Sequence, residues 1–232
     1  MVLNGKIVAV TGGFGQLGLA VVQAALEAGA QVAALDRARA PADAKPLAGV
    51  LALGELDLAE PEAALRALDQ VAARFGGLDA LVNVAGTFRW ETLEQGSLDT
   101  WDLLYRVNLR SAVSTSRAAL PHLTKRGGGR IVNIGAGAAI AKASAGMGAY
   151  TASKSGVLKL TEALAEEVKD RGITVNAILP SIIDTPANRA DMPKADFSRW
   201  VAPRDIANVI VFLLSDQARA VTGALIPVSG RV

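Results

Sequence analysis

The sequence predicts an α/β protein built on one doubly wound parallel sheet of about seven strands, with helices on both faces. Three observations favour this fold class. Short segments rich in Val, Ile, Leu and Ala recur along the chain, helical segments separate them, and a glycine-rich turn follows the first. Parallel strands covered on both faces are apolar along their whole length, as these segments are. No internal repeat or second core is evident, so we expect residues 1–232 to form a single domain.

The predicted strands are short. We expect them at Lys6–Val10, Gln31–Leu35, Val50–Leu53, Leu78–Val82, Arg130–Ile134, Ile173–Leu179 and Leu225–Val228. The predicted helices lie between them. One follows the glycine turn to Ala28, one begins at Pro61, one runs from Ser97 to about Leu120, one carries Tyr150 and ends at Arg171, and one runs from Pro203 to about Ser215. Proline suits a helix start, because the first N–H groups have no partner within the helix.

Apolar residues at helical spacing mark the buried face expected of two helices. The stripe expected as core in the second helix is Leu65, Leu68, Ala72 and Phe75, and the face expected in the third is Leu98, Trp101, Leu104 and Tyr105. Asn108 falls within the third helix, where asparagine is a poor residue. A polar partner for its amide is therefore plausible, with surface exposure as the alternative.

The first strand, the Thr11–Gly18 turn, a helix and a second strand ending in Asp36 form one unit. Glycines allow the backbone to approach a pyrophosphate, and the helix N-terminus offers free N–H groups to it. An acidic residue follows at about the distance typical of ribose recognition. The unit therefore predicts a Rossmann-type dinucleotide-binding domain, although a glycine turn alone can be merely structural.

Asp36 favours NAD(H) over NADP(H) as the cofactor. Its carboxylate can accept hydrogen bonds from the adenosine ribose diol. A 2′-phosphate in its place would be repelled by about 4 kcal/mol at 4 Å with an effective dielectric constant of 20. Arg37 follows directly and could instead turn toward a phosphate, so NADP(H) stays possible.

Tyr150 and Lys154 are four residues apart on a predicted helix, which places them on one face. A nearby ammonium favours the phenolate and lowers the phenol pKa from its ordinary value of about 10. A phenol adjusted in this way suits acid/base chemistry on an alcohol–carbonyl pair. The same spacing also occurs on solvated helix faces, so the pair carries weight only together with the dinucleotide-binding unit.

Composition excludes several classes of function. The 24 Lys and Arg nearly balance the 22 Asp and Glu, and we expect no nucleic-acid partner. The basic segment Lys125–Arg130 is expected to be a solvated loop. No cysteine is present, which excludes disulfides and thiolate metal sites, and we expect no metal. The one histidine, His122, has no evident partner and is expected at the surface near a helix end.

The segment Ile7–Leu26 is uncharged and long enough to span a membrane, which takes about 20 residues. Its four glycines and its glutamines are poor lipid-facing residues, and they also interrupt any signal peptide. A buried strand, turn and helix explain it better. We therefore expect a soluble cytoplasmic protein without membrane association.

Three connections are predicted. Residues 38–49 form a surface connection, and Gly135–Ala149 is a loop of small residues. Residues 181–202 are long for a connection within a compact domain. This segment contains Met192, Phe197 and Trp200, which are costly to expose, so we expect it to close over a substrate.

Taken together, these segments resemble the short-chain dehydrogenase/reductase family over essentially the whole chain. The matching motifs, in order, are Thr11–Gly18, Asp57-Leu58, Asn83-Val84-Ala85-Gly86, Asn108 in Val-Asn-Leu, Tyr150 with Lys154, Pro180 with Thr185, and Val221–Val228. Each motif is weak alone, but six or more in the same order make chance implausible.

The resemblance implies a role for each matching residue. Tyr150 would donate or accept the proton, Lys154 would lower its pKa and hold the nicotinamide ribose, and Asn108 would anchor a proton-relay water. Asp57 and Leu58 would contact the adenine, Asn83, Ala85 and Gly86 would brace the sheet beside the adenosine, and Ile183 and Thr185 would contact the carboxamide. The expected cofactor-binding residues are Gly12, Phe14, Gly15, Gln16, Leu17, Gly18, Asp36, Asp57, Leu58, Asn83, Ala85, Gly86, Tyr150, Lys154, Pro180, Ile183 and Thr185. The expected substrate pocket is Trp90, Ala136, Met147, Met192 and Trp200.

Three positions depart from the family pattern. Gln16 stands where most short forms have their middle glycine, and Ser181 replaces a glycine after Pro180. The family's catalytic serine falls on Ala136 or, counted back from Tyr150, on Gly137. Neither has a hydroxyl, and Ser144 is the nearest candidate. A lost hydrogen bond to the reacting oxygen typically slows a reaction by about 100- to 1000-fold.

The substrate-loop region is similar to that of quinonoid dihydropteridine reductase, a family branch that also lacks the serine. The segments that carry this similarity are Leu179-Pro180, Asp184–Pro186, Asn188-Arg189, Met192-Pro193, Ala195–Ser198 and Trp200. The Asn83–Gly86 and Val-Asn-Leu motifs resemble the general reductases more closely.

The leading hypothesis is an NAD(P)(H)-dependent oxidoreductase that transfers hydride between nicotinamide and a small carbonyl, alcohol or quinonoid substrate. A dihydropteridine reductase-like activity is one alternative. A cofactor-binding sensor or partner subunit without catalysis is an alternative of another class. The resemblance also implies a homodimer or homotetramer formed by the helices around Asn108 and Tyr150.

Overall fold

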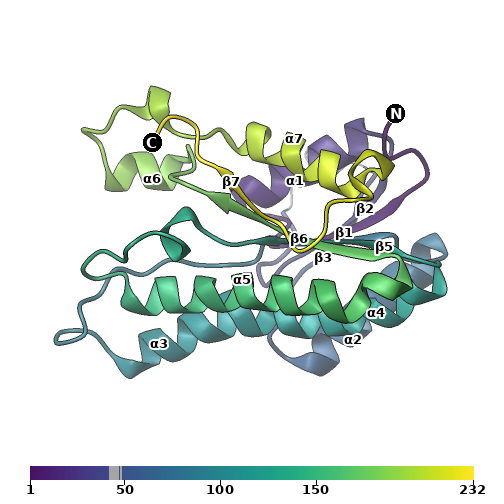
Figure 1. Cartoon of the computed structure of the whole chain (residues 1–232), viewed down its shortest axis with the longest axis horizontal. Coiled ribbons are helices and arrows are strands. Elements are labelled where there is room, and N and C mark those ends of the chain that lie inside the picture. Colours follow the sequence, from purple (N-terminus) through teal and green to yellow (C-terminus); the bar gives the residue numbers. More distant parts are fainter. Residues whose placement is uncertain (42–46, 48) are drawn as a thin grey trace.

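A computed structural model of the protein describes residues 1–41, 47 and 49–232. Its centre is one seven-stranded parallel sheet in the order β3-β2-β1-β4-β5-β6-β7, with helices on both faces (Figure 1). The strands are β1 (Ile7–Thr11), β2 (Gln31–Leu35), β3 (Leu51–Leu53), β4 (Ala80–Asn83), β5 (Gly129–Ile134), β6 (Ile173–Pro180) and β7 (Leu225–Val228). The predicted fold is confirmed, and the strand ends agree with the expectation to within about two residues, the usual uncertainty of element boundaries.

Two helices cover one face of the sheet and three cover the other (Figure 1). Helices α1 (Gln16–Glu27) and α7 (Pro203–Leu214) pack together on the first face, while α2 (Pro61–Phe75), α4 (Ser111–Lys125) and α5 (Gly148–Val168) cover the second. Successive side chains of β1 alternate between the two cores. Val8 and Val10 pack toward α1 and α7, and Ile7 and Ala9 pack on the opposite side.

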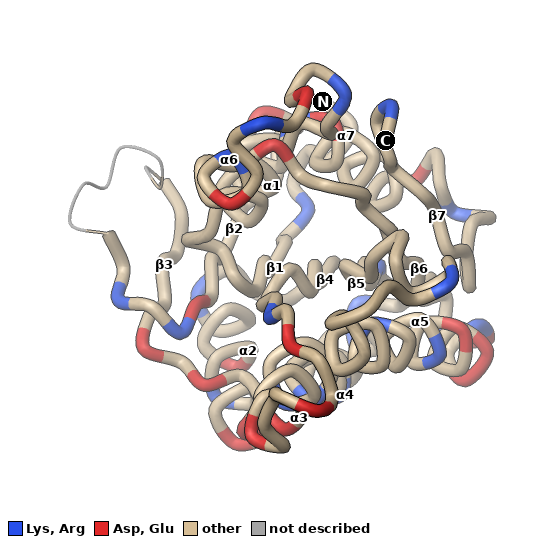
Figure 2. Tube along the Cα trace, turned by 90° about the vertical axis from the view of Figure 1, so that its left-hand side faces the viewer, with Lys and Arg blue, Asp and Glu red and all other residues tan. Residues whose placement is uncertain are grey.

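The strands are almost free of charge. Within the seven described strands, Arg130 at the start of β5 is the single charged residue. Figure 2 shows that Lys, Arg, Asp and Glu gather instead on the surrounding helices and loops. A strand covered on both faces leaves no route for a charged side chain to water, except near its ends.

The strand order reverses at β1, which pairs with β2 on one side and β4 on the other. Thr11 at the end of β1 is in register with Leu35 on β2 and Asn83 on β4. Loops leaving the sheet at this point diverge to opposite faces, and a crevice forms outside the carboxyl ends of the strands.

The expected core stripe of α2 is wrong in part. Leu68 is buried, but Leu65 is 41% exposed and Phe75 is half-buried. The residues that face the sheet are Ala64, Ala67, Leu68 and Val71. Small alanines allow α2 to pack closely against α4, and alanine contributes little to a stripe identified from large apolar residues.

The expected helix from Ser97 to Leu120 is three pieces. Helix α3 (Leu98–Leu104) leads into a π-helical segment, Tyr105–Arg110, and then into α4, which continues past Pro121 to Lys125. Of the expected apolar face only Leu104 is buried, and Leu98, Trp101 and Tyr105 are exposed. The extra residue in the π segment rotates the helix, so a single 3.6-residue period cannot describe both halves.

The segment after β6 is more ordered than a closing loop. It contains α6 (Pro186–Asp191) and a short 3-10 turn, Phe197–Arg199, and Ile183 pairs with Val201. Trp200 is buried against Phe197, with ring centroids 4.8 Å apart. Its burial therefore needs no ligand.

Three smaller expectations can also be compared with the structure. His122 has a partner, since its Nε2 lies 2.9 Å from Asp69 Oδ1. Half of the connection expected at residues 38–49 lies outside the described residues. In the part of the chain that the structure describes, no helix combines the length and apolar character needed to cross a bilayer.

Candidate active site

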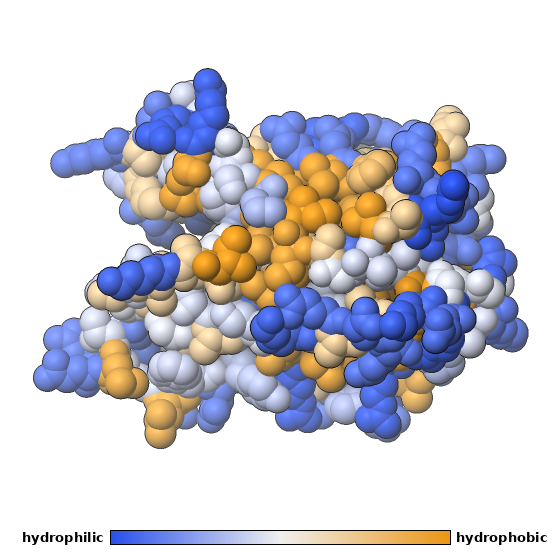
Figure 3. All heavy atoms as spheres, viewed as in Figure 1, coloured by the Kyte–Doolittle hydropathy of each residue, from blue (hydrophilic) through white to orange (hydrophobic). Residues whose placement is uncertain are grey.

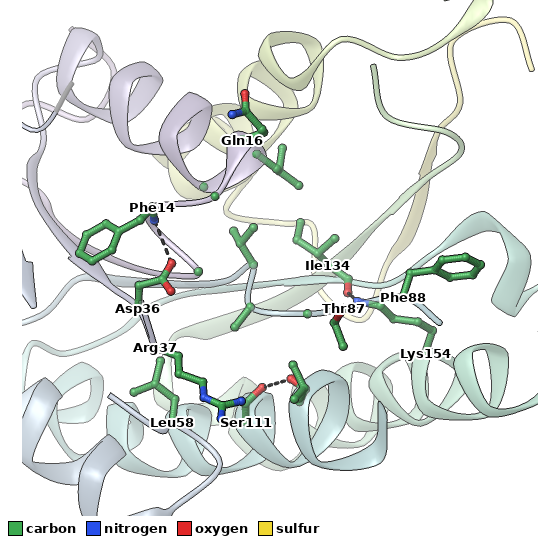
Figure 4. Close-up of a pocket in the computed structure, with 18 of the residues that line it drawn as sticks. Phe14, Gln16, Asp36, Arg37, Leu58, Thr87, Phe88, Ser111, Ile134 and Lys154 are labelled. Carbon is green, nitrogen blue, oxygen red and sulfur yellow. Dashed lines mark hydrogen bonds between the residues drawn. The ribbon is translucent and has the colours of Figure 1, made fainter. Parts of the chain in front are cut away.

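A cleft of about 780 Å³ lies outside the carboxyl ends of the strands (Figure 4). Figure 3 shows its mouth as a notch in the left-hand outline of the molecule, between the α6 region and the helices below. All the expected cofactor-binding residues except Asn83 line it. The other lining residues are Arg37, Ala38, Leu56, Ala59, Val84, Thr87, Phe88, Leu103, Arg106, Val107, Ser111, Ile134, Gly135, Ala136 and Ser181.

The glycine turn at one end of the cleft has no room for side chains. A Cβ on Gly18 would lie 2.0 Å from the Gly12 carbonyl oxygen, and one on Gly12 would lie 2.9 Å from the Ala85 nitrogen. Gly12 also has a φ of +63°, which favours glycine. Gly15 caps α1 without a side-chain hydrogen bond, so the first N–H groups of the helix are left for an anionic ligand. This cradle fits a pyrophosphate.

Asp36 at the end of β2 lies beside this turn. Its Oδ2 accepts a hydrogen bond from Phe14 N at 3.0 Å (Figure 4). Its Oδ1 accepts one from Ala38 N at 2.9 Å. A carboxylate has about four lone-pair positions, so both oxygens can accept further bonds from hydroxyl groups. The carboxylate is therefore held in place with capacity for a ribose diol.

An ion-pair cluster borders the same end of the cleft. Arg106, from the π segment, lies 2.8 Å from Asp57 Oδ2 and 2.6 Å from Glu60 Oε1. Burial tends to raise the pKa of Asp57, but hydrogen bonds from Arg106 and from Ala59 N hold that pKa below its usual range. Asp57 is consequently ionised and fixed at neutral pH.

Tyr150 and Lys154 lie at the opposite end, on α5. The Lys154 ammonium is buried and donates to the Ile134 carbonyl oxygen at 2.7 Å (Figure 4). Burial lowers the pKa of Lys154 to about 8. The Phe88 ring contacts the Tyr150 ring edge-on, with centroids 5.0 Å apart and an interplanar angle of 82°. Lys154 thus carries its charge into the cleft from a fixed position.

The pKa of Tyr150 differs from the expectation. Burial raises it to about 12, whereas the neighbouring ammonium was expected to lower it. Removing a phenolate from water disfavours the charged form, and this burial is the cause of the shift. Tyr150 is therefore fully protonated at neutral pH.

Asn108 connects three segments behind Tyr150 and Lys154. Its Oδ1 accepts from Thr87 N at 2.7 Å, and its Nδ2 donates to Thr87 O and to Ser153 Oγ, each at 3.0 Å. The plausible polar role for this amide is confirmed. Both amide hydrogens are used, so only Oδ1 has capacity left for a water. A Cβ on Gly86 would lie 3.1 Å from that oxygen and 3.3 Å from Lys154 Nζ, which leaves no space for a side chain there.

Asn83 lies beneath the cleft in a buried polar network. Its Nδ2 donates to Asn133 Oδ1 at 2.8 Å and to Ser116 Oγ at 3.1 Å, while its Oδ1 accepts from Thr115 at 2.7 Å. Asn133 in turn donates to Thr161 on α5 at 2.9 Å. The network ties β4 and β5 to α4 and α5, and α5 carries Tyr150 and Lys154.

Of the expected substrate pocket, only Ala136 lines the cleft. Trp90 is 58% exposed and donates its Nε1 hydrogen to Ala145 O at 3.0 Å, while Met147 precedes α5. Met192 and Trp200 belong to the α6 region, outside the lining. A large apolar side chain in a loop does not show by itself which way it points. Trp200 packs against Phe197 of its own segment and not into the cleft.

A comparison with protein families agrees with this geometry. The short chain dehydrogenase family matches residues 6–196, which contain the glycine turn, Asp36, Asn108, Tyr150 and Lys154. This chain is a short-chain dehydrogenase. Its family generally uses NAD(P)(H), and the chain is accordingly an oxidoreductase of that type.

The relatives of this short-chain dehydrogenase are similar over nearly their whole length. The 3-oxoacyl-[acyl-carrier-protein] reductase FabG of Vibrio cholerae is 32% identical over 99% of this chain and 98% of its own. The 2-(S)-hydroxypropyl-CoM dehydrogenase 3 of Xanthobacter autotrophicus is 33% identical over 98% and 96%. A solved short-chain dehydrogenase/reductase from Serratia marcescens BCRC 10948 is 33% identical, covers 100% of this chain and 99% of its own, and superimposes with a TM-score of 0.90.

Three side chains that help to form the cleft, Arg106, Thr87 and Phe88, were not predicted from the sequence. Nothing in the sequence marks Arg106 as a cleft residue, because its carboxylate partners, Asp57 and Glu60, are far away in sequence. Thr87 and Phe88 follow the Asn83–Gly86 motif directly. Their position after a motif at the carboxyl end of a strand was the available signal.

Proposed function

We propose that this short-chain dehydrogenase transfers hydride between NAD(H) and a small carbonyl, alcohol or quinonoid substrate, with Tyr150 as the acid/base. One observation carries the proposal: the Tyr150–Lys154 pair lines the same cleft as the glycine turn and Asp36. A nicotinamide held there would supply or accept the hydride. The glycine turn and α1 would bind its pyrophosphate, and Asp36 would bind the adenosine ribose.

The protonation states favour carbonyl reduction at neutral pH. Tyr150, with a pKa raised to about 12, has a proton to donate to the substrate oxygen. Lys154 remains cationic below its pKa of about 8 and stabilises negative charge that develops on that oxygen. Its bond to Ile134 O fixes the ammonium, so little reorganisation is needed during the reaction.

NAD(H) is the favoured cofactor because of the charges at the ribose end. The Asp36 carboxylate is fixed by two backbone N–H groups, and the Arg106 charge is already paired with two carboxylates. Arg37 lines the cleft and makes no ion pair with any residue in the described ranges. It is the side chain that would favour NADP(H), and Asp36 opposes it.

The nature of the substrate follows from what surrounds Tyr150. Ala136 lines the cleft where the family's serine is expected, so a substrate oxygen would have one fewer hydrogen-bond donor. This supports acceptors that are intrinsically reactive, including a quinonoid dihydropterin. The relatives named above support 3-oxoacyl thioesters and small 2-oxoalkyl compounds as the other candidates.

NADH oxidation with a panel of these three acceptor classes tests the proposal. We expect Tyr150→Phe to lower kcat by about 100- to 10,000-fold, since general acid catalysis typically contributes that much. Tyr105→Phe is the matched control, because Tyr105 is the other tyrosine and is 55% exposed. Full activity of Tyr150→Phe would refute the mechanism. NADH binding without turnover of any acceptor would favour the sensor or partner-subunit alternative.

A homodimer or homotetramer is the proposed assembly. Leu98, Trp101, Tyr105 and Val113 expose apolar surface along α3, the π segment and α4. Figure 3 shows a second apolar area over the edge strand β7, between α5 and α7. Contiguous exposed apolar surface is typical of interfaces between protein chains. A cytoplasmic location, expected from the sequence, stays a prediction.

A further inference from the structure

A second cavity lies at the amino ends of β1, β4 and β5, on the side of the sheet opposite the cleft. In Figure 1 this edge is at the end away from α6 and the C-terminus. The cavity has a volume of about 250 Å³ and is lined by Lys6, Asp79, Arg126, Arg130 and the Gly127–Gly129 loop, among others. This is room for about eight water molecules at about 30 Å³ each. Most of the basic segment Lys125–Arg130, which the sequence predicts as a solvated loop, lines this cavity.

Three cations and one carboxylate line this cavity. The carboxylate is fully engaged with one of the cations. Arg126 Nε donates to Asp79 Oδ1 at 3.0 Å and its NH2 group donates to Oδ2 at 3.2 Å, while Ile7 N donates to Oδ2 at 2.8 Å. The two-point pair neutralises Arg126 and ties the end of α4 to Asp79. The bond from Ile7 N joins the start of β1 to the start of β4. Lys6 and Arg130 are left as the other two charges.

Lys6 and Arg130 share one carboxylate, that of Asp216, which is far from both in the sequence. Lys6 Nζ lies 3.5 Å from Asp216 Oδ1, and Arg130 NH2 lies 3.6 Å from the same oxygen. These separations exceed the normal length of a hydrogen bond. The Asp216 side chain is 74% exposed, so water screens its charge. The two cations are therefore only partly neutralised.

Arg130 is also short of hydrogen-bond acceptors. Its side chain is 14% exposed, and it is the single charged residue in the described strands. One NH1 hydrogen is donated to Gly129 O at 3.0 Å, whereas the buried Nε has no acceptor in the described part of the chain. A guanidinium has five donors, and the Arg130 NH2 group makes no hydrogen bond among the described residues. The cavity that Arg130 lines offers space for an acceptor of these donors.

We propose that this cavity binds a phosphate-type oxyanion that takes the place of Asp216 as the partner of Arg130 and Lys6, while the exposed Asp216 side chain turns out to water. The planar guanidinium matches the oxygens of a phosphate, and the ammonium adds a second, mobile charge. The volume leaves space for a free phosphate or for a phosphate group that carries a small organic substituent. Bound there, the anion connects the starts of β1 and β5. The opposite ends of these strands carry the glycine turn and the Ile134 carbonyl that holds Lys154.

Thermal unfolding of the full chain in sodium phosphate, against sodium chloride of equal ionic strength, tests this site. At ten times the dissociation constant, phosphate should raise the unfolding midpoint by about 3–6 °C for a chain of this length. Arg130→Met and Lys6→Met should each weaken phosphate binding about tenfold or more. Arg117→Met, which removes an exposed arginine of α4 outside the cavity, should leave the shift unchanged.

The outcomes separate the possibilities. If Arg130→Met does not fold, Lys6→Met decides, because Lys6 lies at the cavity rim with 36% of its side chain exposed. An equal midpoint shift in the wild type and the cavity variants would place the anion elsewhere and overturn the proposal. No shift in the wild type at any phosphate concentration up to about 50 mM would also overturn it. A larger shift with glycerol 3-phosphate than with inorganic phosphate would identify a phosphate monoester as the occupant, and the reverse would identify the free ion.

Discussion

Among single residues, burial controls the pKa values of the proposed catalytic pair, Tyr150 and Lys154. Lys154 and Tyr150 lie one helical turn apart, and burial moves their pKa values in opposite directions, to about 8 and about 12. Both shifts favour the uncharged form of the group. The stability of the protein should therefore depend on pH in a way that reports on each residue separately.

The lowered pKa of Lys154 predicts how the stability of the protein changes in mild alkali. Its folded pKa of about 8 is below the ordinary value of 10.5, so the folded state binds fewer protons than the unfolded state between these values. The free energy of unfolding should therefore rise with pH, by roughly 2 kcal/mol between pH 8 and 10. Above pH 10 Tyr150 acts in the opposite sense, because its pKa is raised and the unfolded state loses its proton first.

Urea unfolding at several pH values measures this effect. Lys154→Met should abolish the rise, whereas Lys159→Met, which removes an exposed lysine from the same helix, should retain it. A rise of the same size in Lys154→Met would show that another group is responsible.

Asp36 makes a prediction about the cofactor. Asp36→Ser removes the charge that opposes a 2′-phosphate and keeps a hydrogen-bond acceptor for Phe14 N. We expect the ratio of kcat/KM for NADPH over NADH to rise by about 10- to 100-fold, within the limit set by a charge repulsion of about 4 kcal/mol. Steady-state kinetics with both cofactors measure the ratio. Asp170→Ser, which changes an exposed acid far from the cleft, is the control, and an unchanged ratio in Asp36→Ser would remove the case for NAD(H).

At the scale of elements, the π segment decides where functional side chains lie. It places Asn108 inward to Thr87 and Ser153, and it places Arg106 beside Asp57 and Glu60. π segments are rare and occur often at functional sites. The hydrogen bonds between Asn108 and Thr87, on the loop after β4, offset the loss of regular helix geometry.

Asn108→Leu tests that account. The change removes three hydrogen bonds and leaves both backbone groups of Thr87 without their side-chain partner. We expect the free energy of unfolding to fall by roughly 2–5 kcal/mol, because each buried unpaired group costs about 1–3 kcal/mol. Asn208→Leu, at an exposed position of α7, is the matched control and should change stability by less than about 0.5 kcal/mol. If Asn108→Leu lowered the free energy of unfolding no more than the control does, the hydrogen bonds between Asn108 and Thr87 would not be needed for stability.

At the scale of the whole molecule, the sheet separates two sites. The cleft lies at the carboxyl ends of the strands, and the proposed anion cavity lies at their amino ends. The exposed apolar side chains lie on a third surface, along α3 and α4. Helix α3 and the π segment also contribute Leu103, Arg106 and Val107 to the cleft, so this surface adjoins it.

Trp101→Glu tests the proposed assembly. A charge on this apolar surface should be costly to bury between subunits, so the oligomer should dissociate. Light scattering at micromolar concentration should give the mass of a smaller species, whereas Leu93→Glu, at a loop position that is 79% exposed, should leave the mass unchanged. A monomeric wild-type protein would contradict the proposal.

Much of this protein could be predicted from sequence, and the errors share one cause. The strands were found because covered parallel strands are continuously apolar. The glycine turn was found from the spacing of its glycines between a strand and a helix, and in the structure Gly12, Gly13 and Gly18 leave no room for a Cβ. The errors concerned rotation and direction: the buried side of α2, the exposed face of α3 and the orientation of Trp200. These depend on neighbours that are distant in sequence.

The sequence by itself determined the order of strands and helices, the dinucleotide-binding turn and the helical spacing of Tyr150 and Lys154. These are local properties, set by backbone sterics and by the period of each element. Only the tertiary structure decided the pKa values of that pair, the partners of Asn108 and Arg106, and the cavity around Arg130. Burial and hydrogen bonding between distant segments control these features, because desolvation depends on everything that surrounds a group in the folded chain.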